Sequence, residues 1–273
     1  MDKLRKNIFL AAYSGGVGHL ASAFSLVEIM TALYLEGGMR HTPQDPKWAG
    51  RDLLILSKGH GSLALYAALC MAGYFPESEL WKFCRPGTML GGEPNTLECP
   101  GVEASTGSLG HGLSIGIGMA LALKSDNKRN HVYAIVGDGE CQEGSIWEAA
   151  MSAPAFGLDN LTLIVDNNRI QKMDFIEKII GNEDLSKQFE AFGWEVKTCD
   201  GHDVSDIKRV LAGKWTAGKP RCIFAQTVKG KGVSLMENNP AWHWRMPGKK
   251  ELEVFMEELG ISQEELDFVK GVG

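Results

Sequence analysis

The segment from Ile135 to Ile170, IVGDGECQEGSIWEAAMSAPAFGLDNLTLIVDNNRI, constrains the fold more than any other part of this chain. Short apolar runs bounded by Gly, Asp and Asn are typical of buried strands, and apolar residues at helical spacing lie between them. The segment predicts, in order, a strand at 132–136, a glycine turn at 137–139, a helix at 146–156, a second strand at 161–165 and a polar turn at 166–168.

Polar side chains stand at the ends of both predicted strands. Parallel strands joined by a crossover helix end on the same side of a sheet, so Asp138 and Asn168 are expected to lie close together. A carboxylate, an amide oxygen and a free backbone carbonyl are hard ligands that suit Mg²⁺ or Ca²⁺, and Mg²⁺ often completes its shell with phosphate oxygens. Glycines beside a helix N-terminus let the backbone approach such phosphates.

GDG, followed at this spacing by NN and with EGSIWEA on the intervening helix, resembles the diphosphate-binding motif of thiamine diphosphate enzymes, most closely that of transketolases. The alternative is a plain βαβ unit whose aspartate caps a helix. The resemblance implies a thiamine diphosphate-binding fold with a divalent metal, Mg²⁺ or Ca²⁺. It assigns the metal to Asp138, Asn168 and the carbonyl of Ile170, the diphosphate to Gly137 and Gly139, and coupling between the two cofactor sites of a dimer to Glu143.

Three histidines on glycine-rich turns extend the resemblance from about residue 10 to residue 245. SGGVGH ends in His19, LSKGHG contains His60, and VKGKGVSLMENNPAWH ends in His243. Neutral imidazole exchanges hydrogen bonds with sugar hydroxyls and carries protons near neutral pH. The resemblance therefore implies catalytic roles for these three residues, cofactor contacts for His60 and His243, and substrate contacts for His19 and His243.

The turn STGSLGHG carries two further family positions. The resemblance places Gly107 and Leu109 beside the aminopyrimidine of the cofactor, and we expect a structural role for His111. We expect His202 to belong to a helix cap and His131 to the start of a strand.

The chain departs from the family at Gly92-Glu93-Pro94, where transketolases carry a GHP turn whose histidine contacts the donor sugar. A glutamate there would repel a nearby phosphate and bind hydroxyls or a cation, which places the usual sugar phosphates in doubt. A local misalignment, or a Glu93 that faces solvent, is the alternative. Lys58 and Lys229 are candidate phosphate-facing cations.

Strands alternate with helices along the chain, which predicts an α/β fold with a doubly wound, mostly parallel sheet flanked by helices. We find no internal repeat and no linker, and therefore expect a single domain over residues 1–273. Further predicted elements are helices at 4–13, 25–36, 107–123, 185–192 and 204–212, strands at 53–56, 194–198 and 223–226, a loop at 229–248 and a mostly helical end.

The net charge of −6 and the lack of a basic run argue against nucleic-acid binding. No run approaches the roughly 18 apolar residues of a membrane span, and the first residues lack the pattern of a signal peptide. The six cysteines form no CxxC pair or zinc spacing, which indicates reduced thiols in a cytoplasmic protein.

The resemblance covers only the diphosphate-binding half of a transketolase. In that family the glutamate that activates the aminopyrimidine, and the aromatic ring that stacks on it, come from a second domain, which would lie beyond residue 273. The chain is then the N-terminal subunit of a split transketolase or a fragment, and Met1 and the charged helical tail favour a natural subunit. The implied assembly is an α₂β₂ heterotetramer with a separate C-terminal, pyrimidine-binding subunit.

The implied function is transfer of a two-carbon ketol unit from a ketose or ketose phosphate to an aldose. A decarboxylating dehydrogenase α-subunit or a deoxyxylulose-phosphate synthase shares the GDG and NN motif, although EGSIWEA and the ordered histidines argue against both. A catalytically silent partner with a transketolase-like fold is a third hypothesis. A Rossmann dehydrogenase is disfavoured because no GxGxxG opens a helix followed by an acid about 20 residues later.

Overall fold

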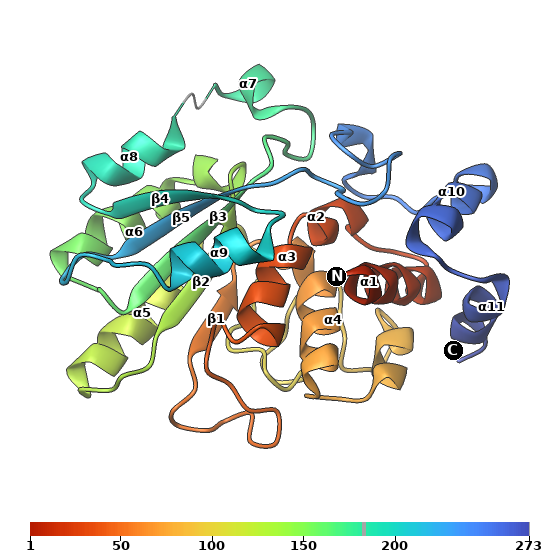
Figure 1. Cartoon of the computed structure of the whole chain (residues 1–273), viewed down its shortest axis with the longest axis horizontal. Helices are drawn as coiled ribbons and strands as arrows, with labels where there is room; N and C mark the ends of the chain where they lie inside the picture. Colours follow the sequence, from red (N-terminus) through yellow and green to blue (C-terminus); the bar gives the residue numbers. More distant parts are fainter. Residues whose placement is uncertain (182–183, 273) are drawn as a thin grey trace.

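Five parallel strands form one sheet in the computed structural model, which describes residues 1–181 and 184–272 (Figure 1). The strand order is β1-β2-β3-β5-β4, and every neighbouring pair is parallel. The strands are β1 (Leu53–Leu56), β2 (Val132–Gly137), β3 (Leu161–Asn167), β4 (Glu195–Asp200) and β5 (Arg221–Gln226). The predicted parallel α/β fold is therefore confirmed.

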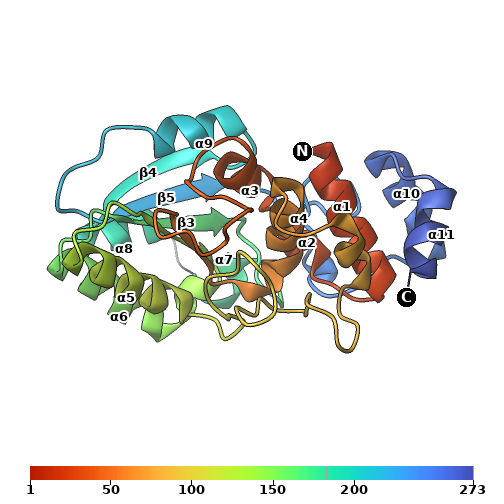
Figure 2. The ribbon, with the colours of Figure 1, turned by 90° about the horizontal axis from the view of Figure 1, so that it is seen from below.

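Helices cover both faces of the sheet and form a second layer beside it (Figure 2). Helices α5 and α6 lie on one face, α9 lies on the other face, and α1, α2 and α4 pack together next to β1. The helices are α1 (Asp2–Gly15), α2 (Leu20–Phe24), α3 (Val27–Met30), α4 (Ser62–Ala72), α5 (Gly112–Ser125), α6 (Gly144–Ala155), α7 (Ile176–Ile179), α8 (Leu185–Ala191), α9 (Val204–Leu211), α10 (Lys249–Leu259) and α11 (Gln263–Gly271). Shorter helical turns are η1 (Thr31–Leu35), η2 (Gly59–Gly61), η3 (Glu77–Lys82), η4 (Glu140–Gln142) and η5 (Pro240–Trp242).

Strand β2 shows why the core divides into two parts. Successive side chains of a strand point to opposite faces. Val132, Ala134 and Val136 pack with α5 and α6, whereas Tyr133 and Ile135 pack with the cluster around α1–α4. Because both faces are covered, the strand reads as a continuous apolar run rather than an alternating one.

The register of β2 and β3 brings the two motif turns together. Gly137 lies opposite Asp166, and the Asp138 N–H donates to the Asp166 carbonyl at 3.3 Å. The ends of both strands therefore meet at one edge of the sheet, as the βαβ pattern predicted.

Two predicted helix boundaries were wrong. The predicted helix at 25–36 does not begin at Ser25, because α2 ends at Phe24, α3 begins at Val27, and the Ser25 hydroxyl donates to buried Asp166 at 2.7 Å. Helix α5 begins at Gly112 rather than Gly107, since Gly107 and Gly110 have φ of 138° and 84°, outside the helical region.

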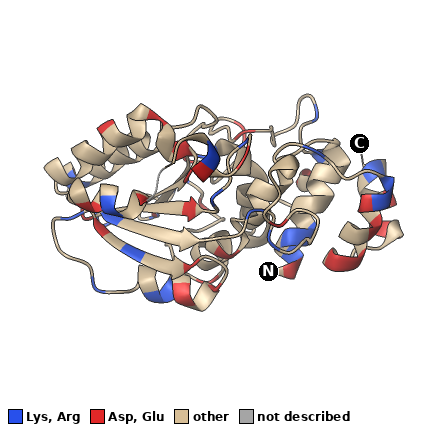
Figure 3. Ribbon diagram, turned by 90° about the horizontal axis from the view of Figure 1, so that it is seen from above, with Lys and Arg blue, Asp and Glu red and all other residues tan. Residues whose placement is uncertain are grey.

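Acidic and basic residues are interspersed over the chain, and α10 and α11 carry both signs (Figure 3). All six cysteines are free thiols. Over residues 1–181 and 184–272, no helix is long and apolar enough to cross a membrane.

Candidate functional site

A cavity of about 680 Å³ lies at the carboxyl edge of the sheet, between the ends of β1, β2 and β3 and the loop after β5. All twelve predicted site residues line it, although they come from segments spread over most of the chain. They are His19, His60, Glu93, Gly107, Leu109, Gly137, Asp138, Gly139, Glu143, Asn168, Ile170 and His243.

Asp138 lies at the end of β2 and is 2% exposed. Its carboxylate accepts hydrogen bonds from the backbone N–H groups of Gly139, at 2.8 Å, and of Arg169. Burial, reinforced by the nearby Asp166 carboxylate, raises the pKa of Asp138 to about 7. A buried carboxylate whose ionised form is disfavoured in this way suits a site that gains a cation.

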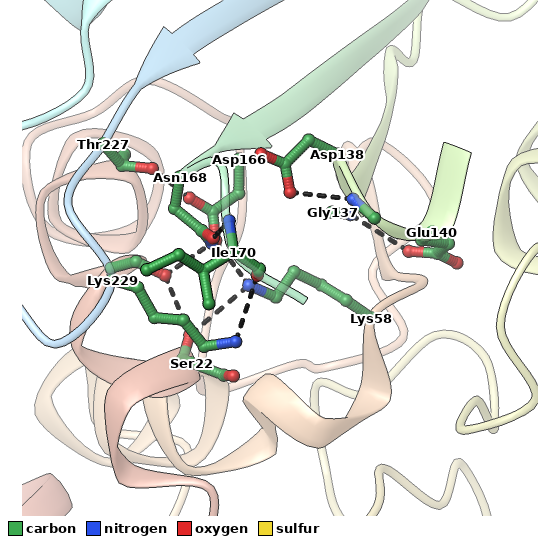
Figure 4. A network of polar contacts seen from close by, with 12 residues as sticks. Ser22, Lys58, Gly137, Asp138, Glu140, Asp166, Asn168, Ile170, Thr227 and Lys229 are labelled. Atoms are coloured by element: carbon green, nitrogen blue, oxygen red, sulfur yellow. Dashed lines mark hydrogen bonds and ion pairs between the residues drawn. The ribbon is translucent and has the colours of Figure 1, made fainter. Parts of the chain in front are cut away.

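Asn168 and Ile170 stand next to Asp138 at the tip of β3 (Figure 4). The Asn168 Oδ1 accepts from the Ile170 N–H at 3.1 Å, and the Ile170 carbonyl accepts from Lys229 Nζ at 3.1 Å. The described residues contain no group of three His, Cys, Asp or Glu side chains arranged for a metal ion. The edge offers instead one carboxylate, one amide and one carbonyl oxygen, which fit a hard cation that shares its shell with phosphate.

Two buried lysines extend into the same region from different elements (Figure 4). Lys58, after β1, is 1% exposed and pairs with the fully buried Asp166. Lys229, after β5, is 2% exposed and also lies 3.1 Å from His243 Nδ1. Burial and the neighbouring Lys58 lower the pKa of Lys229 to about 8. Two ammonium groups around one cavity favour a polyanionic ligand.

The three predicted histidines form one cluster. Their ring centroids lie 5.4 Å apart for His19 and His60, 5.1 Å for His19 and His243, and 5.5 Å for His60 and His243. Burial and the two lysines lower the pKa of His19 to about 4 and that of His243 to about 3, and burial also lowers the pKa of His60. All three rings are therefore neutral at pH 7 and able both to donate and to accept hydrogen bonds.

Glu93 faces the cavity rather than bulk solvent. Its Oε2 is buried without a hydrogen-bond partner among the described residues, and its side chain packs over Gly59 and Gly107. An added Cβ would collide with Oε2 at Gly59 and would lie 3.1 Å from Cγ at Gly107, so only glycine at these positions leaves room for Glu93. Burial raises the pKa of Glu93 to about 7.

Sequence reasoning missed two buried acids at the centre of the site. The Glu140 carboxylate accepts from the N–H groups of Gly110 at 2.8 Å and Gly137 at 3.1 Å, and from the Ser57 hydroxyl. Asp166 accepts from Lys58, Ser25, Thr227 and Asn168. The signal was present in GDGE and DNN, but an acid in a turn is ordinarily interpreted as a capping residue.

The remaining histidines lie outside the cavity. His111 is exposed before α5, with Nδ1 3.0 Å from the Leu109 carbonyl, and His131 contacts the Thr162 hydroxyl at 2.7 Å beside the start of β2. The prediction that His202 belongs to a helix cap was wrong. Asp203 caps α9, whereas the His202 ring points back to Glu28 and the loop after β5.

A parallel α/β sheet with oxygen ligands and buried lysines at its carboxyl edge has the features of a cofactor-binding α/β enzyme, and its donors suit an anionic ligand. Residues 8–271 match the family described as "Transketolase, thiamine diphosphate binding domain". The chain is 41% identical over 255 residues to a subunit of the apulose-4-phosphate transketolase of Actinobacillus succinogenes, covering 93% of this chain and 92% of that relative.

Two further comparisons agree. The chain is 44% identical over 229 residues to the 6-deoxy-6-sulfo-D-fructose transketolase subunit SqwG of a Clostridium species, covering 84% of this chain and 83% of that relative. The solved transketolase of Leishmania mexicana superposes with a TM-score of 0.88 at 28% identity, over 99% of this chain and 43% of that longer chain.

The chain therefore belongs to the transketolase family. It is a thiamine diphosphate-binding transketolase chain of the N-terminal type. The names of these relatives favour neither a decarboxylating dehydrogenase nor a deoxyxylulose-phosphate synthase.

Proposed function

We propose that this chain is the diphosphate-binding subunit of a two-chain transketolase that moves a two-carbon ketol unit from a ketose donor to an aldose acceptor. The observation that carries the proposal is that one cavity is lined by every residue that the family resemblance selects. We further propose that the chain acts as one domain, because its elements pack around a single sheet, and the free thiols support a cytoplasmic location.

Asp138, Asn168 and the Ile170 carbonyl would hold Mg²⁺, with Ca²⁺ as the alternative, because these oxygens gather at one sheet edge. Gly137 and Gly139 would let the backbone approach the diphosphate. Lys58 and Lys229 would balance its negative charge, which their burial in the same cavity supports.

Thiamine diphosphate, when bound, supplies a carbon nucleophile that adds to a carbonyl and stabilises the resulting carbanion. The histidine cluster would orient the ketose, since neutral imidazoles exchange hydrogen bonds with hydroxyls and carbonyls. His60 and His243 would also contact the cofactor, and His19 and His243 the substrate. Gly107 and Leu109 would lie beside the aminopyrimidine. Their position in the cavity wall supports this assignment.

A separate pyrimidine-binding chain would complete the site in an α₂β₂ assembly. Two of the relatives are named as single subunits of an apulose-4-phosphate transketolase, and this chain covers 92% and 94% of their lengths. Glu143 lies exposed at the rim of the cavity, which suits the proposed coupling of two cofactor sites across an assembly. The substrates in the relatives' names, a ketose phosphate and a sulfonated ketose, support a ketose as the donor.

The test of this function is turnover with and without the partner chain. We expect the purified chain, supplied with thiamine diphosphate, Mg²⁺ and a ketose–aldose pair, to give no product, because the activating glutamate of the aminopyrimidine is proposed to come from the partner. Transfer of the ketol unit is expected once the co-purified partner chain is added. Pyruvate in place of the ketose is the control for a decarboxylating activity. Full turnover by the chain alone, or release of CO₂ from pyruvate by the complex, would contradict the proposal.

Replacing Glu93 with histidine is expected to change donor preference. At pH 8, above the pKa of about 7 to which burial raises Glu93, its carboxyl group is ionised. A unit-charge pair about 4 Å apart at an effective dielectric near 20 then amounts to about 4 kcal/mol, and about 1.4 kcal/mol is already a tenfold change in rate. In Glu93→His, kcat/KM for fructose 6-phosphate should rise about tenfold relative to that for uncharged fructose. The measurement is steady-state kinetics of the complex on fructose 6-phosphate and on uncharged fructose.

The matched control is Glu93→Gln, which removes the charge but keeps the shape. It should raise kcat/KM for the phosphorylated sugar more than that for fructose. Equal constants for wild type and both variants on both sugars would show that Glu93 is a bystander.

A further inference from the structure

The loop that carries Lys229 is tied down on both sides of that residue. The Val228 N–H donates to His202 Nε2 at 2.7 Å, and the Gly230 N–H donates to the Ala21 carbonyl at 3.0 Å. The Lys231 carbonyl accepts from Arg5 Nε at 2.9 Å. Lys229 itself is 2% exposed and contacts the Ile170 carbonyl and His243.

Two of these hydrogen bonds, those made by His202 and by Arg5, connect the loop to one buried cluster. Glu28, which is 3% exposed on α3, accepts from Arg5 Nη2 at 2.6 Å through one oxygen and contacts His202 Nδ1 at 2.8 Å through the other. Burial opposes ionisation of Glu28, but the hydrogen bond from His202 and the Arg5 guanidinium hold its pKa below the ordinary value. The cluster thus joins α1, α3, the turn after β4 and the loop after β5.

The bonding partners fix which nitrogen of the His202 ring donates and which accepts. A backbone N–H can only donate, so His202 Nε2 must accept from Val228 and carries no proton. The ring proton therefore lies on Nδ1 and is donated to the Glu28 carboxylate. Gly201 permits this approach, because an added Cβ there would collide with Thr227 Cγ2 and lie 2.8 Å from the Gln226 carbonyl.

We propose that His202, held by Glu28 and Arg5, is a positioning residue that sets Lys229 against the diphosphate region of the cavity. The inference rests on the proposed function, in which Lys229 faces the cofactor diphosphate. Among the described residues, the His202 ring forms hydrogen bonds with Glu28 and Val228, and with none of the proposed metal ligands or the three clustered histidines. Its influence on Lys229 therefore passes through the Val228 backbone. Displacing Val228 would move the adjacent Lys229 away from both of its contacts.

The first test is spectroscopic and independent of catalysis. Long-range ¹H–¹⁵N correlation spectra of the full chain at pH 7.5 are expected to show His202 with a protonated Nδ1 and an unprotonated Nε2. An Nε2-protonated ring or an imidazolium would overturn the inference. His202→Asn, whose shorter amide reaches only toward Glu28, removes the imidazole signals of His202 from the spectrum and thereby assigns them.

The second test is a double-mutant cycle on the binding of thiamine diphosphate with Mg²⁺, by calorimetry on the chain assembled with its partner. His202→Ala should weaken binding about five- to tenfold, and the loss should disappear in a Lys229→Met background, because positioning matters only while the ammonium is present. His202→Gln, whose amide oxygen accepts from Val228, should restore most of the affinity, whereas His202→Asn should not. His41→Gln, which replaces a half-buried histidine bound to the Tyr34 carbonyl elsewhere, is the matched control and should be neutral.

The outcomes separate the two proposals. Wild-type affinity in Lys229→Met would contradict the proposed diphosphate contact and, with it, the inference. A loss in His202→Ala that persists unchanged beside Lys229→Met would leave the function standing and reduce His202 to a structural residue. If His202→Ala fails to fold, the cofactor affinities of His202→Gln and His202→Asn are compared instead. Equal affinities in these two variants would contradict a positioning role for His202.

Discussion

Replacing Asp138 with alanine is expected to remove the metal-dependent binding of thiamine diphosphate. Truncating one side of a buried charged pair costs about 3–5 kcal/mol, and each 1.4 kcal/mol is a factor of about ten in Kd. The affinity in the presence of Mg²⁺ should therefore fall by at least about a hundredfold. The measurement is calorimetric titration of thiamine diphosphate into the assembled complex, with Mg²⁺ and with a chelator.

Removing the Asp138 charge should weaken cofactor binding but should stabilise the metal-free chain or leave its stability unchanged. The folded-state pKa of Asp138 is raised to about 7, so its ionised form opposes folding at neutral pH, and this cost fades as the pH falls and the group is protonated. Asp138→Asn keeps the shape without the charge and should melt at or above the wild-type temperature at pH 7.5. Asp159→Ala, which removes a carboxylate 39% exposed and distant from the cavity, is the control. Unchanged cofactor affinity in both Asp138 variants would refute the metal-site assignment.

Replacing Lys58 with methionine is expected to destabilise the chain by about 3–5 kcal/mol at neutral pH. The Lys58 side chain is 1% exposed and its partner Asp166 is 0% exposed, so the variant leaves a buried carboxylate without its cation. Urea unfolding of the cofactor-free chain measures the effect. Lys124→Met breaks a pair that is 42% and 39% exposed and should cost no more than about 1 kcal/mol.

The pH dependence of the stability lost in Lys58→Met identifies the cause of that loss. Burial raises the pKa of Asp166, and Lys58 together with hydrogen bonds from Thr227 and Ser25 outweighs it, so the net pKa lies below the ordinary value. The wild-type contribution is therefore present above about pH 4 and is lost in more acidic solution. Without Lys58 the pKa should rise, so the deficit should be largest near neutral pH and shrink on acidification. The double variant Lys58→Met/Asp166→Asn should recover most of the stability, and a deficit that is the same at all pH values would point to packing instead.

The sequence by itself determined the parallel sheet and the edge at which Asp138 and Asn168 meet. Apolar runs at 53–56, 132–136 and 161–165 are typical of strands buried on both faces of a parallel sheet, whose polar ends meet at one edge. The local spacing of GDG and NN carried this information, which is why Asp138 and Asn168 were paired correctly.

Interactions between distant segments escaped the sequence. Ser25 was expected to begin a helix but donates to Asp166, and His202 was expected to belong to a helix cap but contacts Glu28 and Val228. A Ser, Asp or His in a turn has a plausible local partner a few residues away, so the pattern cannot distinguish that partner from one on another element.

Only the tertiary structure decided the electrostatics of the site. Glu93 lies over the glycines of two other turns, and its pKa rises because packing removes water from its carboxyl group. Lys58, Lys229 and the three histidines influence one another because the fold brings their separate segments around one cavity. The strands and the meeting of the two motif turns follow from local pattern, but burial and charge proximity arise from long-range packing. These set the protonation states on which binding and catalysis depend.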